Sequence, residues 1–272
     1  MSGFGGRNSR ELSACNKGKL RVVEKFKGGA DGLIRSIGGG SISLWLDSKD
    51  INNADGNLTS WSPKEGTEPS QPTEDKKPNF NSEGWIDNGP CVEFDNNGEA
   101  LVTTTAIDLD GIDKCAVFAT IKTGAIDAHT VVWEYGAQFS LNHGFILGFV
   151  APSGVPLVGS GQSTVNYKTG NASRANETFC FGGVVDRSRT KPDEIDIYVN
   201  GVLEPSTLHP SSHDMVGNFN GAQGSWIGAR NDGADRPMDG LLREFIIIEG
   251  SALREQQAWL MSKALNYKAK IT

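Results

Sequence analysis

The stretch that decides the fold is Glu194-Ile-Asp-Ile-Tyr-Val-Asn-Gly-Val202. In it Ile195, Ile197 and Val199 alternate with polar or aromatic residues, which is the period-two pattern of a strand with one buried face. The pair Asn200-Gly201 then supplies two residues that tolerate positive φ, as a tight hairpin turn requires. The stretch therefore predicts a β-hairpin.

Further strand patterns lie on both sides of this hairpin. They are Ser41–Asp47, Pro90–Phe94, Ala116–Ile121, Val131–Tyr135, Phe145–Phe149, Phe179–Asp186, Gly224–Arg230 and Asp239–Ile248, and a helical pattern begins at Arg254. The chain of 272 residues has 34 glycines and 11 prolines, which is typical of many short strands joined by turns. We expect about ten to twelve strands in two packed antiparallel sheets.

The order of these motifs resembles that of the concanavalin A-like lectin/glucanase (laminin-G-like) jelly rolls. The resemblance rests on Leu-Trp-Leu-Asp at 44–47, Phe94-Asp95, the Tyr-Val-Asn-Gly hairpin, Ile-Gly-Ala-Arg at 227–230 and the closing helix. It covers roughly residues 41–271 and is nearest to the divergent branch found in bacteriophage virion and bacterial surface proteins. The resemblance implies an all-β fold, a concanavalin A-like jelly-roll β-sandwich with a short C-terminal helix.

Charge divides the chain into two parts. Residues 1–40 contain ten glycines, and their eight Lys and Arg against three acidic residues give a net charge of +5. The whole chain has a net charge of −7, so residues 41–272 carry −12. We therefore predict an anchoring arm over 1–40 and a jelly-roll domain over 41–272. The basic residues expected to make the assembly contact are Arg7, Arg10, Lys17, Lys19, Arg21, Lys25 and Lys27. The alternative for the arm is a solvated, disordered terminus.

Composition also narrows the partners and the location. No apolar run approaches the roughly 20 residues of a membrane span, and the first thirty residues contain no signal-peptide core, so we expect neither a membrane anchor nor a Sec route. The acidic charge of the domain predicts no binding to nucleic acid.

The four cysteines Cys15, Cys91, Cys115 and Cys180 are too widely spaced for a zinc site, and we expect buried thiols, with a disulfide as the alternative.

The pair Glu194 and Asp196 is the candidate for catalysis. Two carboxylates at i and i+2 of a strand point the same way, about 6.6 Å apart. Some glycoside hydrolases of this fold carry a further glutamate on the same strand, but here Tyr198 and Val199 follow. The acid and base pair is then incomplete, so we expect no enzyme and place both carboxylates on the solvent face of the hairpin.

Exposed aromatic residues are the candidates for sugar binding. Trp85, in a polar loop, is the first candidate, followed by Tyr167 and His143. Four other tryptophans fall in strand patterns and are expected in the core: Trp45, Trp61, Trp133 and Trp226. We expect no cofactor and no metal, with calcium at the oxygen-rich loops Asp108–Asp113 and Asn231–Arg236 as the alternative.

The leading hypothesis is a non-catalytic structural protein of a phage-like virion, a decoration, fibre or adhesin subunit. It would be oligomeric in an assembly and bind other virion proteins through the arm, and its domain could engage a host surface glycan. The second hypothesis is a stand-alone carbohydrate-binding module, and the third is a glycan-cleaving enzyme that uses Glu194 and Asp196.

Overall fold

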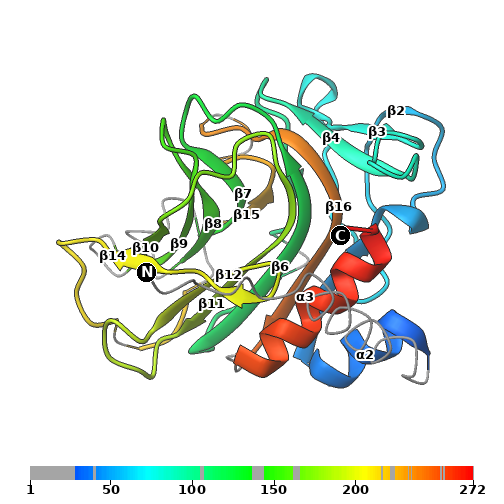
Figure 1. Cartoon of the computed structure of the whole chain (residues 1–272). Helices are drawn as coiled ribbons and strands as arrows, with labels where there is room; N and C mark the ends of the chain where they lie inside the picture. The colour runs from blue at the N-terminus through cyan, green and yellow to red at the C-terminus, as the bar shows by residue number, and fades with distance from the viewer. Residues whose placement is uncertain are drawn as a thin grey trace, which may run out of the picture.

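The computed structural model describes residues 28–38, 41–104, 107–136, 144–161, 166–215, 217–220, 224–231, 233, 235–251, 253 and 255–271. Within these residues the chain forms two antiparallel sheets packed face to face, with helices on one side (Figure 1). The predicted all-β sandwich is therefore confirmed. No helix in this part of the chain is long and apolar enough to cross a membrane.

The larger sheet has nine strands in the described residues. Its order is β13 (Val202–Leu203), β12 (Ile195–Val199), β11 (Thr178–Asp186), β6 (Lys114–Thr123), β16 (Asp239–Glu249), β4 (Cys91–Asp95), β3 (Asn79–Asn81) and β2 (Gly56–Asn57), and β1 (Ile42–Asp47) also pairs with β16. The predicted hairpin joins β12 to β13, where φ is +52° at Asn200 and +81° at Gly201. These positive values confirm the tight turn.

The smaller sheet has seven strands in the same part of the chain. Its order is β14 (Ser206–Leu208), β10 (Tyr167–Gly170), β9 (Val155–Ser160), β8 (Phe145–Val150), β7 (Thr130–Tyr135), β15 (Ser225–Ile227) and β5 (Leu101–Val102). Two short 3-10 helices, η2 (Ser48–Asp50) and η3 (Glu74–Lys76), lie in the segment between β1 and β3. The main core lies between the two sheets and contains Trp61, Trp133, Phe145 and Phe245.

Two helices, α2 (Gly29–Gly38) and α3 (Glu255–Ala269), cover the outer face of the nine-stranded sheet (Figure 1). Leu33 and Ile34 of α2 join a second buried cluster with Trp45 of β1 and Leu265 of α3. The predicted boundary at residue 40 is therefore wrong, because residues 29–38 bury apolar side chains on the domain itself. Residues 1–27, with all seven predicted anchor residues, lie outside the described part of the chain.

A buried ion cluster joins α2, α3 and the sheet. The Lys268 ammonium lies 2.8 Å from an Asp31 oxygen and 2.9 Å from an Asp47 oxygen, and it also donates to Glu244. Lys64 lies 2.9 Å from Asp31 and 3.5 Å from Asp47. Burial opposes the charged form of Lys268, but the carboxylates of Glu244 and Asp47 outweigh it and raise its pKa. The cluster therefore ties α2 to the rest of the domain by charge as well as by apolar contact.

The three cysteines in the described residues are free and buried, as predicted. Burial raises the pKa of the Cys91 and Cys180 thiols to about 12, so both remain protonated at neutral pH. Cys15 lies outside the described residues.

Candidate functional site

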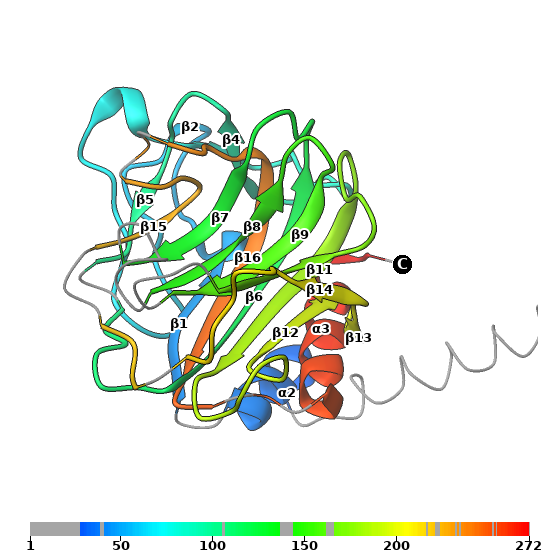
Figure 2. The ribbon, with the colours of Figure 1, turned by 90° about the vertical axis from the view of Figure 1, so that its left-hand side faces the viewer.

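The outer face of the seven-stranded sheet carries one continuous row of residues. The row runs in register across six strands as Val102, Trp226, Glu134, Ile146, Gly159 and Tyr167. Residues directly opposite one another in a sheet point to the same side. The neighbours Ile227 and Tyr135 belong to the core between the sheets, so the row points outward. None of the described helices lies over this face (Figure 2).

Trp226 lies toward one end of the row, beside a buried ion pair. Its partner across the strands is Glu134, whose carboxylate accepts a 2.9 Å hydrogen bond from Nε of Arg230. Arg230 also lies 3.5 Å from Asp235. The expectation that Trp226 is a core residue is wrong, because its neighbours in β15 occupy the inner face and leave the indole half-buried on the outer one.

Tyr167 lies at the other end of the row and stacks on a histidine. The Tyr167 and His209 ring centroids are 4.6 Å apart. Burial raises the pKa of Tyr167, and the positive charge of Arg236 opposes this shift. The main-chain carbonyl of Arg236 accepts from the amide of Val131, which holds this arginine beside β7. Gly159 is the residue opposite Tyr167 in the row.

This face can therefore offer apolar ring surfaces and polar groups at once. Trp226 and Tyr167 provide the rings and Arg236 provides a partly exposed guanidinium, whereas the Glu134 and Arg230 ion pair is buried. Ligand sites combine aromatic walls with a few well-placed polar groups in this way. The alternation of Trp226 with Ser225 and Ile227 could have identified it as an outward-facing residue, but the sequence does not indicate that none of the described helices lies over this face.

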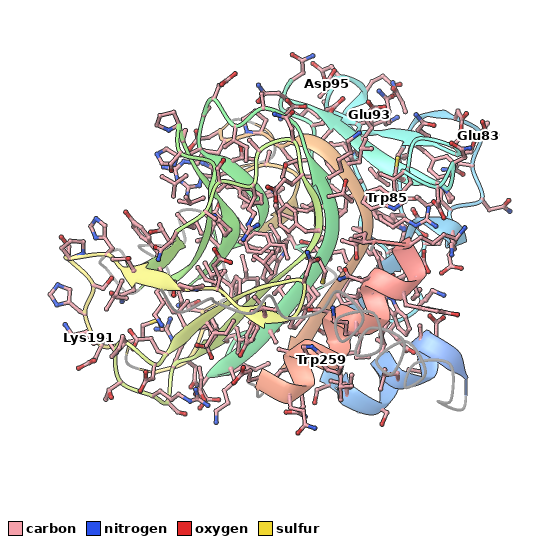
Figure 3. The ribbon with its side chains drawn as sticks, in the orientation of Figure 1. Glu83, Trp85, Glu93, Asp95, Lys191 and Trp259 are labelled. Carbon is pink, nitrogen blue, oxygen red and sulfur yellow. The ribbon has the colours of Figure 1, made fainter. Side chains whose placement is uncertain are left out.

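The other predicted sugar-binding aromatics have different places. Trp85 is 2% exposed, and its Nε1 donates a 3.0 Å hydrogen bond to the carbonyl of Ala269 at the end of α3 (Figure 3). The expectation of an exposed indole is wrong, because the turn from Trp85 to Gly89 folds the loop back on itself and places the ring beneath the helix. His143 lies outside the described residues, so Tyr167 alone of the three belongs to the row.

The two carboxylates of the hairpin strand are not both on a solvent face. Glu194 is 0% exposed, neither of its carboxylate oxygens has a hydrogen-bond partner among the described residues, and burial raises its pKa. The expectation that it faces solvent is therefore wrong, whereas Asp196 is half-buried at the strand edge. Tyr198, which stands where the further glutamate would be needed, is buried in the cluster beneath the helices.

A metal site does not emerge from the described residues. They contain no group of three or more His, Cys, Asp or Glu that could hold a metal ion. In the first oxygen-rich loop, an Asp108 oxygen accepts from the amide of Asp110, as in a turn. Part of the second loop, Asn231–Arg236, lies outside the described residues.

A depression of about 400 Å³ also opens on the outer face of the nine-stranded sheet. Its polar lining includes Asn81, Glu93, Asp95, Lys122 and Asp239. Figure 3 shows Glu93 and Asp95 together on β4. The aromatic residue in its lining, Phe94, belongs to the core, so this depression offers no ring for stacking.

Comparison with known proteins finds solved structures with a similar fold. No family model matches the chain, and no curated protein matches it. Domain 4 of AbnA, a GH43 extracellular arabinanase from Geobacillus stearothermophilus solved with arabinotriose, has a TM-score of 0.55 and 18% identity, over 82% of this chain and 98% of that one. The Trypanosoma rangeli sialidase, solved with the inhibitor DANA, has a TM-score of 0.51 and 11% identity, over 80% of this chain and 32% of that one. At these identities the likeness is one of fold.

Proposed function

We propose that this chain binds carbohydrate without cleaving it, and that an oligosaccharide lies across the outer face of the seven-stranded sheet. The observation that carries the proposal is the in-register row with Trp226 toward one end and Tyr167 at the other. Stacking on the two rings would supply apolar contact, and the partly exposed guanidinium of Arg236, beside β7, would bind hydroxyl groups.

Two further observations support this reading. A structural neighbour of this fold, the arabinanase domain, was solved with arabinotriose, a short oligosaccharide. The candidate catalytic pair does not form an open acid and base site, since Glu194 is buried and Tyr198 replaces the further carboxylate. Binding without cleavage is the function that accounts for both.

A glycan array followed by calorimetry with the strongest array ligand tests the proposal. Trp226→Ala and Tyr167→Ala should each weaken binding by about tenfold, equivalent to about 1.4 kcal/mol. The matched control is Tyr267→Ala, which removes a ring that is 43% exposed on α3, the helix that covers the other sheet. The proposal fails if no glycan binds, or if both row variants bind as tightly as the control.

The second candidate function is display on a phage-like virion, with the carbohydrate-binding domain facing outward. The charge split supports it, since residues 1–40 carry +5 and residues 41–272 carry −12. Purification of the protein from its native source, with sizing and mass spectrometry of what travels with it, tests this role. A particle of other virion proteins is the expected result, and a lone monomer would exclude it.

A further inference from the structure

A separate pocket lies at one edge of the sandwich, where the chain passes from one sheet to the other. Strand β13 is an edge strand of the nine-stranded sheet and β14 an edge strand of the seven-stranded sheet, and Glu204 and Pro205 connect them. The pocket has a volume of about 330 Å³. It is lined by Lys168, Asp196, Leu203, Glu204, Pro205 and Ser206.

The charged groups of this edge pocket are only partly engaged by the chain. Glu204 accepts a 3.0 Å hydrogen bond from Nη2 of Arg174. In the described residues, by contrast, the side chains of Asp196 and Lys168 form no hydrogen bond and no ion pair within 4.0 Å. One carboxylate and one ammonium are therefore available to a ligand. They come from different sheets, Asp196 from β12 and Lys168 from β10.

A buried carboxylate, Glu194, lies two residues before Asp196 in the chain. Burial raises the pKa of both Glu194 and Asp196, and the positive charge of Lys168 opposes this shift in each. Within the described part of the chain, both oxygens of Glu194 lack a hydrogen-bond partner although the side chain is fully buried. Buried polar atoms normally have a partner, so the Glu194 carboxylate is unusual among the described residues of this edge.

We propose that the edge pocket binds one neutral sugar residue, independently of the site on the outer face of the seven-stranded sheet. Its volume is near the lower end of the range for ligand pockets, about 300 to 1,000 Å³, which suits a single ring. The lining has no large excess charge, because it contains both Lys168 and Asp196 and its Glu204 is bonded to Arg174, so nothing in it favours a charged ligand over a neutral one. The hydroxyl groups of a sugar both donate and accept hydrogen bonds, so they suit a lining that contains an ammonium and carboxylates. Leu203 and Pro205 offer an apolar wall to the C–H face of the sugar ring.

Nuclear magnetic resonance tests the proposal. The amide chemical shifts of the full chain are measured during titration with glucose, galactose, mannose and arabinose in turn. At least one sugar should shift the amide signals of Leu203 and Ser206 in a saturable way. Asp196→Asn and Ser206→Ala should each weaken that binding about tenfold, because each removes a hydrogen-bonding group of the site. The exposed Asp75, far from the pocket in sequence and outside its lining, supplies the control Asp75→Asn, which should leave binding unchanged.

Each outcome is decisive for one of the two sites. The edge pocket is excluded if none of the four sugars causes a saturable shift at these amides, or if neither variant changes it. If Trp226→Ala abolishes glycan binding while both pocket variants bind normally, the site on the outer face of the seven-stranded sheet is supported and the edge pocket is excluded. If the pocket variants weaken sugar binding while Trp226→Ala and Tyr167→Ala do not, the edge pocket is supported and the outer-face site is excluded. Should Asp196→Asn fail to fold, Ser206→Ala decides, since it removes only a hydroxyl group.

Discussion

Trp226 and Tyr167 belong to one cross-strand row on the outer face of the seven-stranded sheet, four strand intervals apart. At the usual spacing of adjacent strands their Cα atoms are roughly 19 Å apart. A ligand that touches both rings must therefore be an extended oligosaccharide.

This separation predicts a dependence on ligand length. An oligosaccharide long enough to reach both rings should lose affinity with Trp226→Ala and with Tyr167→Ala. A disaccharide should respond to only one of the two variants, because it cannot span the row. Calorimetry with a length series of one glycan measures this. Equal sensitivity of the disaccharide to both variants would contradict a ligand extended along the row.

Removal of α2 should destabilise the domain. We expect a chain that begins at Ser41 to melt about 5 °C below one that begins at Gly28, because Leu33 and Ile34 lose their buried contacts, a cost of about 2 kcal/mol or more. Both chains lack residues 1–27, so the difference reports α2 alone. Identical melting temperatures would show that the helix does not stabilise the domain.

Loss of Lys268, the lysine of the buried ion cluster, should destabilise the domain. Lys268→Met leaves Glu244 buried without its cation and leaves Asp47 with Lys64 alone, and we expect a loss of about 3 kcal/mol in the free energy of unfolding. The control is Lys270→Met, two residues on, whose side chain is 69% exposed and pairs with Asp87. That change should cost less than about 1 kcal/mol. Denaturant unfolding measures both, and similar losses would refute the role of the cluster.

Glu99 should make the protein less stable as the pH rises. Burial raises the pKa of its carboxyl from 4.5 to about 7, although the amide of Asp95 donates to it and acts in the opposite direction. Between these values the folded chain holds a proton that the unfolded chain has lost, so this contribution to stability is present below pH 4.5 and is lost as the pH rises through about 7.

The variant Glu99→Gln should reduce this pH dependence, since the amide does not titrate. Thermal melting at pH 5 and pH 8 compares the variant with the parent chain, and Glu83→Gln, at an exposed position, serves as the control. A pH dependence of Glu99→Gln that matches that of the parent would show that this carboxyl does not contribute.

Gly201 has two reasons to be glycine. Its φ is +81°, and a Cβ there would lie 3.0 Å from the Cα of Trp259 in α3. Gly111 has a similar φ of +77° with nothing within 4 Å of the same position. Gly201→Ala should therefore cost more than Gly111→Ala, and Gly201→Val on the order of 1–3 kcal/mol or more. Equal melting temperatures for the two alanine variants would show that the contact with α3 is unimportant.

The sequence alone determined the sandwich and its hairpin. Alternation over Ile195, Ile197 and Val199, followed by Asn200-Gly201, is a local pattern, and the backbone of a strand converts it directly into two faces and a turn. The C-terminal helix was predictable for the same reason, since its apolar stripe follows the helical period.

Only the tertiary structure decided which of those faces are covered. Alternation separates Trp226 from Ser225 and Ile227, but it does not say that the helices lie on the other sheet and leave the indole half-buried. Trp85 and Glu194 have polar sequence neighbours, as exposed residues often do, yet both are buried. Trp85 packs at the end of α3, which is distant in sequence, and Glu194 lies at the edge of the sandwich. The physical reason is that a strand pattern is set by residues next to one another, whereas burial depends on elements that meet only after the chain has folded.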